Sequence, residues 1–154
     1  MPLQLMAGDV FAVENPMILG RAINAAQLIW SDDNEATYSH NGIITDPTGK
    51  TLEALWTVQE QNLYARYAGK RMLIARPDSP EPFIRSAIDQ IRKDHLGQWY
   101  PAWRLPLHLI PPFAKYLTIG GRFLVCSELT AKYLFLAGVR HGQYTGTRPD
   151  TLAD

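Results

Sequence analysis

Apolar and polar residues alternate along this chain in patterns that predict short strands and amphipathic helices. Helices are expected where apolar residues recur on one stripe, as they do in residues 16–30 and 78–97. Strands are expected where short β-type runs lie between turn residues. The predicted strands are residues 9–13, 38–45, 50–56 and 71–76, and the other predicted helices are residues 59–67 and 127–137.

This order of elements favours an α+β domain, in which helices pack on a central antiparallel sheet. A chain of 154 residues can bury one hydrophobic core, so a single domain over residues 1–154 is expected. Residues 97–121 are rich in proline and aromatic residues without a clean period, and residues 140–154 form a polar tail. We expect no regular element in either segment.

The strongest hairpin signal lies at Asp46-Pro47-Thr48-Gly49. Proline presets φ for a turn, and glycine can take the positive φ that a turn requires. If Thr45 pairs with Lys50 across this turn, His40 and Glu53 point to the same face of the sheet as diagonal neighbours, roughly 7–8 Å apart by Cα. A slip of one residue would send them to opposite faces, so their proximity depends on this register.

The charge balance and the cysteine count exclude several classes of protein. With 15 basic and 15 acidic residues the formal net charge is zero, which argues against a nucleic-acid partner. One cysteine excludes a disulfide framework and suits a reducing compartment. No segment is apolar for long enough to span a bilayer, and residues 1–9 lack the features of a secretory signal. A cytoplasmic protein without an integral membrane segment is therefore expected.

Cys126 is the only cysteine, and it stands between an apolar run and a predicted helix. A helix N-terminus presents unpaired N–H groups and the positive end of the helix dipole, which stabilise a thiolate over a thiol. Taken alone, such a cysteine is more often a small buried apolar residue. Its chemistry therefore depends on which residues accompany it.

A cysteine hydrolase needs a thiolate, a base that takes and returns a proton, and a polar group that orients the base. Cys126, His40 and Glu53 could supply these three parts. Each has a plainer interpretation, because a strand histidine or glutamate usually lies on the solvent face. The three become a site only if the fold brings them together.

The other histidines show no pattern of a second site. His95 near a helix end and His141 in the tail are expected to be solvated, and His108 among leucines to be half buried. The histidines and the one cysteine have no metal-ligand spacing. We expect neither a metal nor an organic cofactor.

Five short motifs occur in an order that resembles circularly permuted NlpC-type papain-like hydrolases. They resemble "G-D-v", "S-H-x-G-I", "v-x-E-A", "C-S-E-L" and "t-P-d-x-L", and they lie at residues 8–10, 39–44, 52–54, 125–129 and 148–152. The resemblance covers the chain from Gly8 to Leu152. The order histidine, acid, cysteine is the permuted order, opposite to that of ordinary papain.

The resemblance implies a papain-like fold with the nucleophile helix packed on the sheet. It implies that Cys126 is the nucleophile, His40 the general base and acid, and Glu53 the group that holds the imidazole. It also implies that Tyr100, in a "G-x-x-Y" context, contacts the substrate or the oxyanion, although Pro101 stands where the family has an aspartate.

Three further groups are candidates near this site. The Cys126 backbone N–H could donate to an oxyanion at the helix start. Ser39 and Ser127, beside the histidine and the cysteine in the chain, are candidates for substrate or oxyanion contact. Glu128 in the first helical turn should stabilise the helix and point away from the thiolate, whose formation its charge would oppose.

The expected function is a cysteine-dependent amidase or peptidase that works through an acyl-enzyme on a small peptide or amide. One alternative is a lipid-directed acyltransferase or thioesterase, similar to the relatives of lecithin:retinol acyltransferase, with the apolar and aromatic residues 99–117 lining a groove for an acyl lipid. The other is a non-catalytic binding module of the same fold, although an intact set of three residues argues against it.

Overall fold

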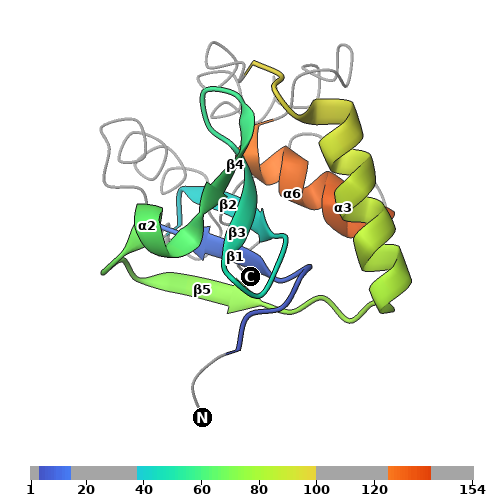
Figure 1. Cartoon of the computed structure of the whole chain (residues 1–154), viewed down its shortest axis with the longest axis horizontal. Coiled ribbons are helices and arrows are strands. Elements are labelled where there is room, and N and C mark those ends of the chain that lie inside the picture. The colour runs from blue at the N-terminus through green and yellow to red at the C-terminus, as the bar shows by residue number, and fades with distance from the viewer. Residues whose placement is uncertain (1–3, 15–37, 100–124, 140–154) are drawn as a thin grey trace, which may run out of the picture.

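The computed structural model describes residues 4–14, 38–99 and 125–139, and within them the chain forms one antiparallel sheet with helices packed on it (Figure 1). The α+β fold class expected from the sequence is therefore confirmed. The strand order across the sheet is β4-β3-β2-β1-β5. The strands are β1 Val10–Val13, β2 His40–Ile44, β3 Lys50–Ala54, β4 Val58–Asn62 and β5 Met72–Ala75.

Several expectations fall on residues outside the described ranges. They are the helix at 16–30, Tyr100, His108 and the rest of the proline-rich segment after residue 99, and the polar tail with His141 and its motif at 148–152.

The β2–β3 hairpin has the register that its turn predicts. Ile43 pairs with Leu52, and the Thr45 N–H donates to the Lys50 carbonyl at 2.7 Å. Within the turn, Asp46 Oδ1 accepts a 2.8 Å hydrogen bond from the Thr48 N–H, and the glycine that ends it has a φ of 84°. Local turn chemistry thus sets the alignment on which the candidate site depends.

The prediction of a helix at residues 59–67 is wrong for the first half of that segment. Residues Val58–Asn62 form strand β4, which pairs along its whole length with β3, and only Leu63–Tyr67 form the short helix α2. The strand sequence is almost entirely polar, so it lacks the alternation that marks a strand, and pairing with its neighbour decides its conformation. Asn62 ends the strand and caps α2, because its Oδ1 accepts a 3.0 Å hydrogen bond from the Ala65 N–H.

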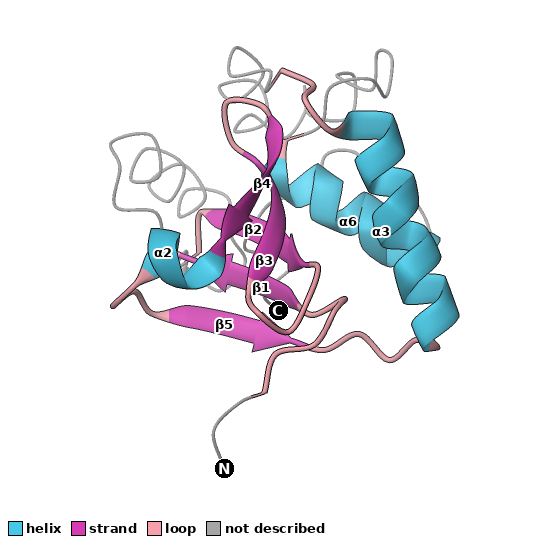
Figure 2. Ribbon diagram, viewed as in Figure 1, coloured by secondary structure: helices cyan, strands magenta, loops and turns pink. Residues whose placement is uncertain are grey.

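Two longer helices, α3 Glu81–His95 and α6 Cys126–Leu136, pack against each other, and α6 lies on strands β2 and β3 (Figure 2). The stripe expected on α3 is buried, as are the α6 residues that face it. This core contains Ile43, Leu52, Ala54, Ile84, Ala87, Ile88, Ile91, Leu129 and Tyr133. A second apolar cluster contains Leu5, Phe11, Val13, Ile44, Leu63 and Tyr67. The central strands β1, β2 and β3 are therefore buried on both faces.

No side chain caps the start of α3. Ser79, just before the helix, donates its hydroxyl to the Ala137 carbonyl just after α6, at 2.5 Å. This bond ties the beginning of one long helix to the end of the other.

The "G-D" motif ties the chain before β1 to the rest of the fold. Asp9 is buried and accepts two hydrogen bonds from the Arg76 guanidinium, at 2.8 and 2.9 Å. The Gly8 carbonyl accepts a hydrogen bond from the Tyr133 hydroxyl of α6 at 2.8 Å, and the Gly8 N–H donates to Ile44. These contacts hold α6 in place relative to β1 and β2. In the described part of the chain, no helix has the length and apolar character needed to cross a membrane.

His95 was expected to be solvated, and this expectation is wrong. Only 3% of His95 is exposed, because it continues the buried stripe of Ile84, Ile88 and Ile91 at helical spacing. Its Nε2 lies 2.7 Å from Lys132 Nζ and its Nδ1 lies 2.8 Å from Gln98 Oε1. Since an ammonium can only donate, Nε2 accepts and Nδ1 carries the proton that goes to Gln98.

Acid should weaken the fold through His95. Burial and the charge of Lys132 lower the pKa of His95, so the unfolded chain takes up a proton near pH 6.5 that the folded protein resists. The stabilising contribution is full above about pH 6.5 and is lost as the pH falls toward the folded pKa. In His95→Gln, the slope of unfolding free energy against pH should fall by at most about 1.4 kcal/mol per pH unit. Urea unfolding between pH 5 and 7.5 measures it, and equal slopes in both proteins would contradict the assignment.

Candidate active site

His40 and Glu53 form a buried hydrogen-bonded pair. The Nε2 of His40 lies 2.8 Å from Oε2 of Glu53, and the side chains are 5% and 0% exposed. His40 is the first residue of β2, and Glu53 lies on the next strand at the diagonal position that the hairpin register predicts. The sequence-based expectation that the two side chains share a face is confirmed.

Gly42 makes room for this pair. On one side it pairs with Phe11 of β1, and on the other side the hairpin register places it opposite Glu53 of β3. A Cβ at Gly42 would come within 2.5 Å of the Phe11 ring and 2.8 Å of Glu53 Cγ, closer than real Cβ atoms approach other atoms. The absence of a side chain therefore lets the carboxylate cross the strand surface toward His40.

Gly42→Ala should disturb both the fold and the pair. Overpacking of this kind typically costs about 1–3 kcal/mol, and either the Phe11 ring or the Glu53 side chain must move to relieve it. We expect a lower urea midpoint and a higher pH midpoint for alkylation of Cys126. Gly69→Ala is the matched control, because that glycine has a positive φ but no neighbour within 4 Å of an added Cβ. It should lose stability without changing the alkylation midpoint, and the same behaviour in Gly42→Ala would contradict the proposed role.

Glu53 has two further partners that the sequence did not reveal. The Tyr67 hydroxyl donates to Oε2 at 2.6 Å, and the Thr51 hydroxyl donates to Oε1 at 2.5 Å. Thr51 lies two residues before Glu53 on the same strand, so the two-residue period of a strand could have indicated it. Tyr67 comes from α2, and no local pattern places it here.

Aromatic rings enclose the imidazole. The His40 ring centroid lies 6.2 Å from that of Phe11 and 6.1 Å from that of Tyr67, and the latter two are 5.6 Å apart. These rings keep water away from the His40–Glu53 pair, and a hydrogen bond is electrostatically stronger in such surroundings.

Cys126 is the first residue of α6 and only 4% of it is exposed. The His40 side chain and the backbone N–H groups of Asn41 and Ser127 lie close enough to the thiol to act on its charge. Burial raises the pKa of Cys126, but the hydrogen bond and charge of His40, together with those N–H groups, lower it below its usual value. Because Glu53 occupies Nε2, Nδ1 is the imidazole nitrogen left to face the thiol.

The charges of the site support one another. Burial lowers the pKa of His40, but hydrogen bonds and charges from Cys126 and Glu53 outweigh it and raise the pKa to about 9. Burial likewise raises the pKa of Glu53, and its bonds with His40, Thr51 and Tyr67 bring it below the ordinary value. The shifts therefore favour the charged form of each group, which is a thiolate, an imidazolium and a carboxylate in a row.

Glu128 stabilises the helix, as expected. Its carboxylate accepts a 3.2 Å hydrogen bond from the Val125 N–H and forms the second half of a capping box, and the side chain is fully buried. It thus reaches back over the helix start, to the residue before Cys126.

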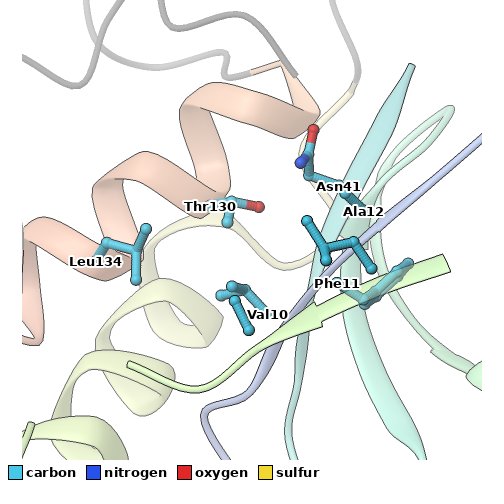
Figure 3. Close-up of a pocket in the computed structure, with 8 residues that line it drawn as sticks. Val10, Phe11, Ala12, Asn41, Thr130 and Leu134 are labelled. Carbon is cyan, nitrogen blue, oxygen red and sulfur yellow. The ribbon is translucent and has the colours of Figure 1, made fainter. Parts of the chain in front are cut away.

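The candidates for substrate contact are placed only in part. Ser39 and Ser127 are both buried, next in sequence to His40 and Cys126. Tyr100 lies outside the described residues. A small pocket opens between α6 and the sheet, where Asn41 lies beside the first turns of α6 (Figure 3). It is lined by Val10, Phe11, Ala12, Asn41, Leu73, Ala75, Thr130 and Leu134.

The described residues thus bring together Cys126, His40 and Glu53, from one helix and two strands. In residues 4–14, 38–99 and 125–139, no group of three or more histidine, cysteine, aspartate or glutamate residues could hold a metal ion. Comparison of the sequence with protein-family models and with curated proteins found no match.

Proposed function

We propose that this protein is a cysteine hydrolase of the amidase or peptidase type, with a permuted papain-like fold. The observation that carries the proposal is a buried row of three side chains: Glu53, His40 bonded to it at 2.8 Å, and Cys126 at the start of α6, whose thiol and the imidazole shift each other's pKa. The chain order histidine, acid, cysteine and the packing of α6 on an antiparallel sheet support the permuted arrangement.

In the first half of the reaction, the Cys126 thiolate attacks the carbonyl carbon of an amide. A C–S bond forms and the carbonyl π electrons move to the oxygen, which the backbone N–H at the helix start stabilises. When the tetrahedral intermediate collapses, the C–N bond breaks and the His40 imidazolium gives its proton to the departing nitrogen.

In the second half, neutral His40 takes a proton from water as the water oxygen attacks the thioester. The C–S bond then breaks, the carboxylic acid leaves, and the thiolate and imidazolium are restored. Glu53 stays ionised throughout and holds the ring, as the carboxylate does in the triad template.

Two probes that share the same reactive group but differ in the group attached to it test the proposal. A peptidyl chloromethyl ketone and a long-chain acyl chloromethyl ketone are incubated with the protein near pH 7, and the adduct mass and its rate are compared with those of N-acetylcysteine. We expect the peptidyl probe to modify Cys126 at least tenfold faster than it modifies the free thiol, and Cys126→Ala to take up nothing.

The other outcomes identify the alternatives. Faster labelling by the acyl probe would replace the amidase by a lipid-directed acyltransferase or thioesterase of the same fold. If neither probe reacts faster than with the free thiol, the protein is a binding module and the proposed function is wrong.

A further inference from the structure

We infer that Thr51 and Tyr67 are positioning residues, which together clamp the Glu53 carboxylate so that one of its oxygens stays aimed at His40. This inference rests on the proposed function, because it concerns the same site. Neither residue is predicted to touch the reacting atoms.

Each carboxylate oxygen is held by a separate hydroxyl. Oε1 accepts from Thr51 at 2.5 Å, while Oε2 accepts from Tyr67 at 2.6 Å and lies 2.8 Å from His40 Nε2. Rotation of the carboxylate would break both hydroxyl bonds at once. The two hydroxyls therefore fix the plane of the carboxylate, with one oxygen toward Tyr67 and His40 and the other toward Thr51.

The same two hydroxyls also stabilise the negative charge of the buried Glu53 carboxylate. Glu53 is fully buried, and a buried carboxylate without donors would take up a proton. The hydrogen bonds from Thr51 and Tyr67, with that of His40, lower the pKa of Glu53 against the effect of burial. Burial and the charge of Glu53 raise the pKa of Tyr67, so the phenol keeps its proton and remains a donor.

The two hydroxyls reach Glu53 by different routes. Thr51 lies two residues earlier on β3, where strand geometry puts both side chains on one face. Tyr67 is the last residue of α2, which Asn62 caps, and its ring also packs against those of Phe11 and His40. The short helix α2 thereby gains a role, which is to deliver one phenol to the site.

The test compares Tyr67→Phe and Thr51→Val with the parent protein. Each variant keeps the shape of its side chain and loses one donor to a charged acceptor. The rate constant for peptide hydrolysis, or for labelling by the peptidyl probe, should fall about 10- to 100-fold. The KM should change little, and the pH midpoint for alkylation of Cys126 should rise. Thr51→Ser, which restores the hydroxyl, should recover most of the rate and the parent midpoint.

Two controls separate positioning from stability. Tyr133→Phe removes another buried tyrosine hydroxyl, which bonds the Gly8 carbonyl and not Glu53. Thr45→Val removes the hydroxyl of a half-buried residue just after β2, which bonds the Lys50 carbonyl. Both controls should keep the parent alkylation midpoint even where urea unfolding shows a loss of stability.

Two results have different meanings. If Tyr67→Phe and Thr51→Val overlay the parent in rate and midpoint while Glu53→Gln changes both, the clamp inference is wrong and the proposed hydrolase stands. If Glu53→Gln also overlays the parent, the proposed function itself fails.

Discussion

Replacing His40 by alanine should raise the pH at which iodoacetamide alkylates Cys126 to about 8.5 or above, the value of an unperturbed thiol. His40 provides the main effects that oppose burial and lower the pKa of Cys126, so without it only the N–H groups of Asn41 and Ser127 still oppose burial. The rate of the proposed hydrolysis should fall about 10²- to 10⁴-fold, because general acid–base catalysis is lost as well. The measurement is the alkylation rate as a function of pH, followed by mass.

The midpoint is a better readout than the rate at one pH. A smaller side chain at position 40 admits the reagent more easily, which changes the plateau rate but not the pKa. His40→Gln fills much of the space and should show the same upward shift. His95→Gln is the matched control, since His95 is also buried but bonds Lys132 and Gln98. A His40→Ala profile that superimposes on the parent would show that His40 is not the partner of Cys126.

Local chemistry explains the parts of the fold that could be predicted. The turn from Asp46 to Gly49 sets the hairpin register, and the register places Glu53 beside His40 without any knowledge of the rest of the sheet. The periodic stripe of α3 likewise predicts its buried face. In both cases a short stretch of sequence contains all the determinants.

The elements that could not be predicted depend on distant parts of the chain. The polar strand β4 exists because β3 lies beside it, and pairing overrides its weak intrinsic preference. His95 is buried because α6 covers the end of α3 and Lys132 supplies a donor. Tyr67 reaches Glu53 only after β4 and α2 have reversed the chain, so local spacing cannot reveal it.

The same distinction applies to the candidate site. Short sequence motifs and hairpin geometry identify the candidate catalytic residues, which are Cys126, His40 and Glu53. Their charge states depend on burial and on hydrogen-bond donors from elsewhere in the fold, including Thr51 and Tyr67. Gly42 could be predicted only in part. The sequence shows that it belongs to the motif, but only the structure shows the Phe11 ring and the Glu53 carboxylate for which it makes room.

Glu53→Gln should lower the rate of hydrolysis by roughly 10²- to 10⁴-fold, with a smaller change in KM. Glutamine keeps the shape of Glu53 but replaces one acceptor oxygen by an NH₂ group. All three neighbours, Thr51, Tyr67 and the His40 imidazolium, need an acceptor there. An NH₂ group that faces His40 would make Nε2 the acceptor and move the ring proton to Nδ1, which is the tautomer that cannot take a proton from water at Nδ1.

The alkylation profile reports the same loss from the thiol. Without the carboxylate charge the imidazolium is less stable, so the pKa of His40 should fall from about 9 and that of Cys126 should rise. Glu60→Gln on β4 is the control, because Glu60 is also ionised but pairs with Lys50 and Arg92. It should leave both the alkylation midpoint and the rate near those of the parent. If Glu53→Gln keeps the parent rate and midpoint while remaining folded, Glu53 does not hold His40 and the function proposed for this site fails.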